Sequence, residues 1–215
     1  MALPLDKPKP HRKKLHRREH GTRFITFSCF RRLPLLGKAG ARNIFVESLY
    51  EAREQFGFAL YAWVIMPEHV HILMHTRSKA PMATILKSIK LKTSIRILTR
   101  WKELRAPILL KILGPSGSPR FWQPGGGFDR NVRDHDEFMR EVMYVHRNPV
   151  KRGLVERPEW WEWSSCRWWM GMQGASCRPY QSPLTLQSQG QCHECDPPPL
   201  YDDELAAMMA SKSYM

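Results

Sequence analysis

The stretch Trp63-Val64-Ile65-Met66-Pro67-Glu68-His69-Val70-His71-Ile72-Leu73-Met74-His75 decides the fold expected for this chain. Two apolar runs meet at a Pro-Glu pair, which predicts a hairpin of strands 58–66 and 69–75. Side chains alternate between the two faces of a strand, so His69 and His71 point the same way. Two imidazoles on one face can share a metal ion. Such a pair can equally be the polar side of an edge strand.

The other elements are predicted from alternation for strands and from a helical period for helices. Strands are expected at 23–30 and 121–123, and helices at 40–56, 81–101 and 135–148. Asp134 is a typical N-cap for the last helix, and Pro149 is expected to end it. Several tryptophans between 160 and 169 are expected to pack a short terminal helix. This order predicts an α+β fold with a central antiparallel sheet and flanking helices.

The composition indicates a partner with negative charge. The chain has 215 residues, with 34 Lys and Arg against 20 Asp and Glu, and a net charge of +14. Such an excess is typical of nucleic-acid-binding proteins, although some basic proteins have no such partner. No run of 18 apolar residues exists, and the basic N-terminus has no apolar core of a signal peptide. Five cysteines, two of them in apolar surroundings, fit a reduced, cytoplasmic protein without a membrane partner.

Charge is concentrated in two places outside the hairpin. Residues 1–20 form a basic arm that is too polar to pack alone, and we expect it to bind DNA phosphates through Arg12, Lys13, Lys14, Arg17 and Arg18. Helix 81–101 carries a basic ridge at four-residue steps, which we expect to have no acidic partner and to contact phosphate: Lys92, Arg96 and Arg100. Both can equally be solvated surface. Residues 171–215 are expected to be a disordered, low-complexity acidic tail.

Tyr144 is a candidate nucleophile on helix 135–148. A phenol has a pKa of about 10, so only about one in a thousand is ionised at neutral pH, and a nearby cation or metal shifts that balance. Arg140 and Arg147 lie about one turn away on either side, and both are expected to contact DNA. Asn148 lies one turn further along and offers a carbonyl oxygen as a third metal ligand. A tyrosine on an amphipathic helix is more commonly a packing residue.

Four stretches, in this order, resemble the REP-associated tyrosine transposases, a group of HUH single-strand transposases. They are Thr26-Phe-Ser-Cys-Phe-Arg-Arg32, Met66-Pro-Glu-His-Val-His71, Phe121-Trp-Gln with Asp129-Arg-Asn131, and Tyr144-Val-His-Arg-Asn-Pro-Val150 followed by Arg152-Gly-Leu154. Trp163-Ser-Ser165 adds a fifth stretch. The resemblance covers residues 21–170. Phe128 departs from it, because a tyrosine is expected before Asp129.

The resemblance implies a ferredoxin-like domain over residues 21–170, with His69, His71 and Asn148 as metal ligands and Tyr144 as nucleophile. Two nitrogens and one oxygen, with water filling the other positions, suit Mg²⁺ or Mn²⁺ as cofactor if the substrate phosphate also coordinates. The resemblance implies single-stranded or hairpin DNA as partner. The expected activity is cleavage and rejoining of single strands through a 5′-phosphotyrosine. The alternatives are a domesticated, non-catalytic DNA-hairpin-binding protein and a metallohydrolase that uses water. The sequence leaves open whether the protein is a monomer or a homodimer, and whether Tyr144 serves the histidines of its own subunit.

Overall fold

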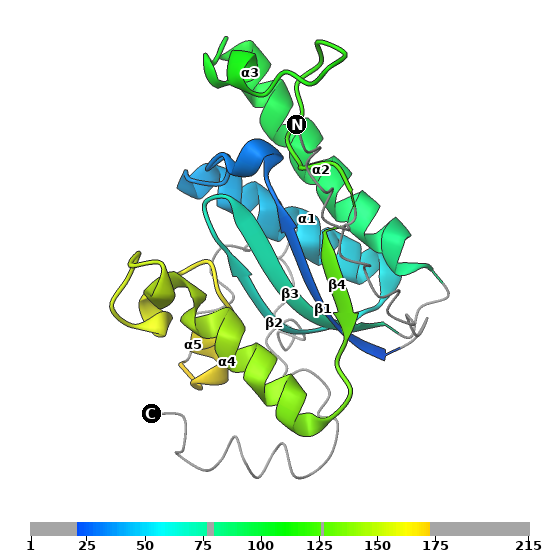
Figure 1. Cartoon of the computed structure of the whole chain (residues 1–215), viewed down its shortest axis with the longest axis vertical. Coiled ribbons are helices and arrows are strands. Elements are labelled where there is room, and N and C mark those ends of the chain that lie inside the picture. The colour runs from blue at the N-terminus through cyan, green and yellow to red at the C-terminus, as the bar shows by residue number, and fades with distance from the viewer. Residues whose placement is uncertain (1–20, 77–79, 126, 173–215) are drawn as a thin grey trace, which may run out of the picture.

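Four antiparallel strands form one sheet, in the order β2-β3-β1-β4 (Figure 1). This computed structural model describes residues 21–76, 80–125 and 127–172. The strands are β1 (Gly21–Ser28), β2 (Ala59–Ile65), β3 (His69–Thr76) and β4 (Phe128–Asn131). β1 and β2 lie on either side of β3, with helix α1 (Ala39–Phe56) between them in sequence, and helix α2 (Met82–Glu103) connects β3 towards β4. This is the ferredoxin-like order, and it confirms the predicted α+β fold.

The first face of the sheet is covered by α1 and α2 and holds the larger core. Strand residues whose side chains alternate towards this face meet apolar side chains of both helices; they include Ile25, Phe27, Val70, Ile72 and Met74. Gly57 ends α1 as predicted, because its backbone takes the left-handed conformation at φ 63° and its N–H donates to the Arg53 carbonyl. The two helices support the sheet on this face, and other elements cover the second face.

The second face is covered by helix α4 (His135–Lys151) and by the segment that follows it. That segment contains a short 3₁₀ helix, η2 (Pro158–Trp160), and helix α5 (Cys166–Trp169). Phe138, Val142 and Val145 of α4 pack on Phe24 and Leu73 of the sheet. Asp134 caps α4 as predicted, because its carboxylate accepts from the Glu137 N–H at 2.7 Å. The predicted core packing of the terminal tryptophans is confirmed for Trp161 and Trp169, which are buried.

Two predictions of local structure were wrong. Pro149 lies inside α4 rather than after it, and the helix continues to Lys151. A proline removes one N–H and disfavours helix at the preceding residue, but Asn148 and Pro149 are both buried, and this packing outweighs that preference. Residues 121–123 form only a single bridge, between Trp122 and Cys29, and the fourth strand is β4 instead.

β4 has no apolar alternation, and ion pairs hold it in place. Arg23 of β1 donates two hydrogen bonds to the Asp129 carboxylate, with Arg23 buried and Asp129 partly buried. Arg130 pairs with Glu137 and Glu141 of α4. These pairs connect β4 to β1 on one side and to α4 on the other.

Three short elements complete the described chain: η1 (Phe30–Arg32), helix α3 (Ile108–Lys111) and the loop between α3 and β4. Cys29 and Cys166 are buried free thiols, in agreement with the expected apolar surroundings. Among the described residues, no helix has the length and apolar character needed to cross a membrane.

Candidate functional site

The turn between β2 and β3 fixes the position of the histidine pair. The backbone carbonyl of Pro67 accepts from the Leu36 N–H at 2.9 Å, and that of Glu68 accepts from the Cys29 N–H at 2.8 Å. The hairpin closes with a bond from the Met66 N–H to the His69 carbonyl at 2.8 Å. The predicted hairpin is therefore confirmed, and the strand that begins at His69 starts from a turn held at several points.

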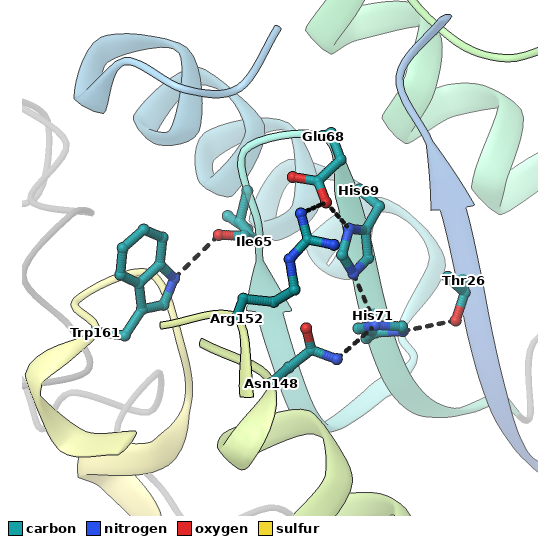
Figure 2. A network of polar contacts seen from close by, with 8 residues as sticks. All are labelled: Thr26, Ile65, Glu68, His69, His71, Asn148, Arg152 and Trp161. Carbon is teal, nitrogen blue, oxygen red and sulfur yellow. Dashed lines mark hydrogen bonds and ion pairs between the residues drawn. The ribbon is translucent and has the colours of Figure 1, made fainter. Parts of the chain in front are cut away.

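His69 and His71 point towards each other on the face covered by α4 (Figure 2). Their Nε2 atoms are 3.0 Å apart, and both side chains are buried. The Asn148 amide of α4 reaches the same place, with its Nδ2 atom 3.0 Å from His71 Nε2. The three side chains that were predicted as metal ligands thus meet at one point, although Asn148 is 77 residues from His71 in sequence.

The second nitrogen of each ring is occupied by a neighbour. His69 Nδ1 lies 3.2 Å from Glu68 Oε1, which as a carboxylate can only accept, so Nδ1 carries the proton. His71 Nδ1 lies 2.7 Å from Thr26 Oγ1. With Asn148 Nδ2 as the donor, His71 Nε2 accepts and the proton of the ring is on Nδ1, which donates to Thr26. A metal bound at Nε2 requires the same tautomer, whichever way the amide is turned. Both Nε2 atoms therefore turn a lone pair to the same point.

Two lone pairs that face each other at 3.0 Å repel, and a cation between them would remove that repulsion. A proton does not serve, because burial lowers the pKa of His71 to about 3, with His69 and Arg32 adding to that effect. Burial also lowers the pKa of His69, despite the opposite effect of Glu68. Neighbouring ligands of a six-coordinate ion at about 2.1 Å lie about 3.0 Å apart. The donor set therefore fits a divalent metal.

Within the described residues, no three His, Cys, Asp or Glu side chains are grouped to hold a metal. The third protein donor of a site here is accordingly the Asn148 amide. Turning that amide by 180° brings Oδ1 to the place where Nδ2 lies, which supplies an oxygen ligand. Two nitrogens and one oxygen leave room for water and a phosphate oxygen, an arrangement that suits Mg²⁺ or Mn²⁺.

Glu68 and Arg152 form an outer layer that sequence reasoning did not assign to the site. Arg152 lies just after α4 and pairs with Glu68 Oε1 at 2.8 Å, the same carboxylate that holds His69 (Figure 2). Trp161 donates to the Ile65 carbonyl at 3.0 Å and anchors the following segment to β2. The signal for Glu68 was its place directly before His69. The signal for Arg152 was its place in the Arg152-Gly-Leu154 stretch.

Tyr144 lies beside the histidine pair of its own chain. Its ring is edge-on to the His71 ring at 5.2 Å between centroids and to the Phe24 ring at 5.8 Å. The Lys151 ammonium lies 5.0 Å from the centre of the Tyr144 ring. Tyr144 is 39% exposed, so its ring contacts the site while remaining open to a substrate.

The predicted DNA-binding residues fall into three groups. Arg140 and Arg147 are exposed and line an open groove that contains Tyr144. The arm residues Arg12, Lys13, Lys14, Arg17 and Arg18 lie outside the described residues.

The ridge on α2 belongs to the opposite face of the sheet, and the expectation that it has no acidic partner was wrong. Lys92 pairs with Glu51 at 3.2 Å, and Arg96 pairs with Glu51 at 2.6 Å and Glu47 at 3.8 Å. Arg100 pairs with Glu103 at 3.3 Å. The acidic partners of Lys92 and Arg96 come from α1, which periodicity within α2 alone does not reveal. Phosphate contact by these residues stays a prediction.

Comparison with known proteins finds a similarity to transposases. Residues 22–125 match the family described as Transposase IS200 like. The REP-associated tyrosine transposase of Escherichia coli (strain K12) is 26% identical over 108 residues, which are 50% of this chain and 54% of that protein. The chain thus matches about half the length of this curated relative.

A solved structure of the REP-associated tyrosine transposase bound to a REP hairpin has a similar fold. The TM-score is 0.56 at 22% identity, and the similarity covers 82% of this chain and 96% of that chain. The family match contains the histidine pair and ends before α4, so the roles of Tyr144 and Asn148 depend on the geometry above. Over residues 22–125 the chain matches the IS200-like transposase family, and it has a distant similarity to the REP-associated tyrosine transposase.

Proposed function

We propose that this protein cleaves and rejoins single-stranded, hairpin-associated DNA through Tyr144, with the help of Mg²⁺ or Mn²⁺. The observation that carries the proposal is the convergence of His69, His71 and Asn148 at one point beside the Tyr144 ring. A protein that only binds DNA has no use for two buried, neutral imidazoles with opposed lone pairs. The family match and the relative bound to a REP hairpin support hairpin DNA as the substrate.

The ligands His69, His71 and Asn148 would hold the metal, which would polarise a phosphoryl oxygen of the DNA and help to neutralise its charge. Glu68 and Thr26 accept the Nδ1 protons of the two histidines, which keeps each ring in the tautomer and orientation that a ligand needs. The low pKa of His71 keeps that ring neutral throughout the physiological range.

Tyr144 Oη would attack the phosphorus atom of one phosphodiester. The new bond joins Oη to phosphorus, and the bond from phosphorus to the 3′ oxygen of the preceding nucleotide breaks. The phenol proton passes to water, and the departing 3′ oxygen takes up a proton. The products are a 5′-phosphotyrosine and a free 3′ hydroxyl, so the phosphodiester energy is retained and the reverse attack can rejoin a strand.

The closeness of Tyr144 to His71 of the same chain supports a reaction within one subunit. Mixing Tyr144→Phe with His71→Ala protein tests this arrangement. We expect no activity in the mixture, because neither chain has both parts. Activity restored by mixing would mean that Tyr144 serves the histidines of a partner subunit.

A denaturing gel of the protein with labelled hairpin DNAs, including a pool with randomised stems, tests the activity itself. We expect a covalent protein–DNA band with Mg²⁺ or Mn²⁺ that is absent with chelator and in Tyr144→Phe. The matched control is Tyr50→Phe, which changes a tyrosine of α1 on the other face and keeps the band. Cutting that survives Tyr144→Phe without an adduct favours a metallohydrolase. Tight binding of the pool with neither adduct nor cutting favours a non-catalytic hairpin binder.

A further inference from the structure

An open groove of about 870 Å³ runs beside Tyr144, between the sheet and α4. Its aromatic residues are Phe24, Phe128 and Tyr144, and its basic residues along α4 are Arg140, Arg147 and Lys151. Aromatic faces next to cations form the combination by which proteins hold single-stranded nucleic acid. None of the three proposed metal ligands lines the groove, so the reaction at Tyr144 does not account for all of it.

Phe128 is the residue in this groove that packing does not explain. It is 49% exposed at the start of β4, and it is absent from the buried core on this face. Its ring meets Phe24 only edge-on, at 6.2 Å between centroids. A half-exposed phenylalanine on an edge strand contributes little to folding, and its remaining surface is available to a flat, apolar ligand.

The position of Phe128 is closely fixed relative to the proposed reaction centre. Phe128 is paired with Thr26 across the β1–β4 ladder, and the Thr26 hydroxyl contacts His71. Phe24 connects the rings, since it stacks on His71 at 5.5 Å and meets Tyr144 at 5.8 Å. A base lying on Phe128 is therefore adjacent to a phosphate that meets Tyr144.

The cations of the groove are available to phosphate. Among the described residues, Arg140, Arg147 and Lys151 form no ion pair, and all three are exposed. Arg130 differs, because Glu137 and Glu141 hold it against α4. Cations along α4 that form no ion pair, together with an aromatic ring on β4, can take the backbone and a base of the same strand.

We propose that Phe128 is a stacking platform for one unpaired base of the DNA, next to the nucleotide whose phosphate meets Tyr144. The statement that the neighbouring phosphate is the one attacked by Tyr144 rests on the proposed function. The stacking of an unpaired base on Phe128 does not depend on it. A base in a duplex has both faces covered by its neighbours, so the platform selects single-stranded DNA at this position. Phe128 thereby contributes to the choice of substrate without taking part in the chemistry.

The test compares two probes that differ only in their bases. One is an oligothymidylate of about 12 nucleotides, a length suited to such sites, and the other is an abasic deoxyribose-phosphate oligomer of equal length. Fluorescence anisotropy with chelator present measures both affinities without cleavage. We expect Phe128→Ala to weaken oligothymidylate binding about 5- to 100-fold and to leave abasic binding unchanged. Phe128→Tyr is expected to retain wild-type binding.

Two further variants separate stacking from other effects. Phe128→Leu keeps an apolar side chain but removes the aromatic face, so it is expected to behave like Phe128→Ala. Trp160→Ala, the matched control, removes a 52% exposed aromatic ring outside the groove and is expected to change neither affinity. Phe128 variants that bind both probes as the wild type does, or that lose both equally, overturn the proposal.

The two proposals fail in different ways. If Phe128→Ala loses affinity only for the probe that has bases, and the wild type never forms an adduct, the stacking platform is supported and the strand-transferase function is refuted. An adduct in the wild type, together with equal probe preference in the wild type and Phe128→Ala, leaves the strand transferase standing and removes the platform.

Discussion

Replacing His146 by glutamine removes a proton-binding site that only the unfolded chain uses. His146 lies in α4 between Tyr144 and Asn148, and its Nε2 atom is 2.9 Å from Ser165 Oγ. Its Nδ1 atom has no hydrogen-bond partner among the described residues. Complete burial lowers the pKa of the ring from 6.5 to about 3, because a charged imidazolium there would lose its water without gaining an acidic partner.

The lowered pKa of His146 sets how the stability of the fold changes with pH. Between about pH 6.5 and about pH 3 the unfolded chain binds a proton at His146 and the folded chain does not. The contribution to stability is complete above pH 6.5 and is lost as the pH falls towards 3. The loss is about 1.4 kcal/mol per pH unit inside this window, or about 2 kcal/mol between pH 7 and pH 5.

Urea unfolding of the wild type and of His146→Gln, at several pH values with chelator present, measures this difference. His69 and His71 contribute to both proteins, so the difference between the two curves isolates His146. We expect the wild type to lose about 2 kcal/mol more than the variant between about pH 7 and about pH 5. Parallel curves would refute the reasoning. If the variant does not fold, an NMR titration of His146 in the wild type with a pKa above 6 would refute it as well.

Three further predictions concern the site and its supports. Glu68→Gln removes the carboxylate that orients His69, so Mn²⁺ affinity measured by calorimetry is expected to fall about 10- to 100-fold; equal affinity would contradict this. Gly127→Ala places a Cβ atom 2.2 Å from the Thr26 carbonyl oxygen, and Gly125→Ala, also at positive φ, meets open space. In urea unfolding we expect a loss of about 2 kcal/mol or more for the first and about 1 kcal/mol for the second. Asp134→Ala removes the cap of α4 and is expected to cost about 1 kcal/mol, seen as a lower Tm.

The core of the fold could be predicted because local patterns and tertiary packing agree there. The Pro67-Glu68 pair favours a turn between two strands, and Gly57 favours the end of a helix, so each points to one local structure. The metal ligands could be predicted in part, since alternation alone puts His69 and His71 on one face. That Asn148 reaches the same point is a tertiary fact, for which the sequence offered only the resemblance to a family.

The failures share a cause, which is that long-range contacts outweighed local preference. β4 consists of Phe-Asp-Arg-Asn, a poor strand by composition, and it forms because Arg23 and Glu137 pair with its charged residues. Pro149 reads as a helix end, yet the buried packing of α4 carries the helix through it. The ridge on α2 looked unpaired, because the acidic partners of Lys92 and Arg96 are on α1.

Helix α4 also fixes the spacing between two residues of the proposed site. Tyr144 and Asn148 are four residues apart, so the helical rise sets their separation along the axis at about 6 Å, whatever the rest of the protein does. A small translation or rotation of α4 on the sheet moves the Tyr144 nucleophile and the Asn148 amide together. It changes their distances from His69 and His71 but not the spacing between them. Alignment of the site thus depends on one variable, the position of α4 on the sheet. The salt bridge from Arg152 to Glu68 holds that position at the end of the helix nearest the histidines.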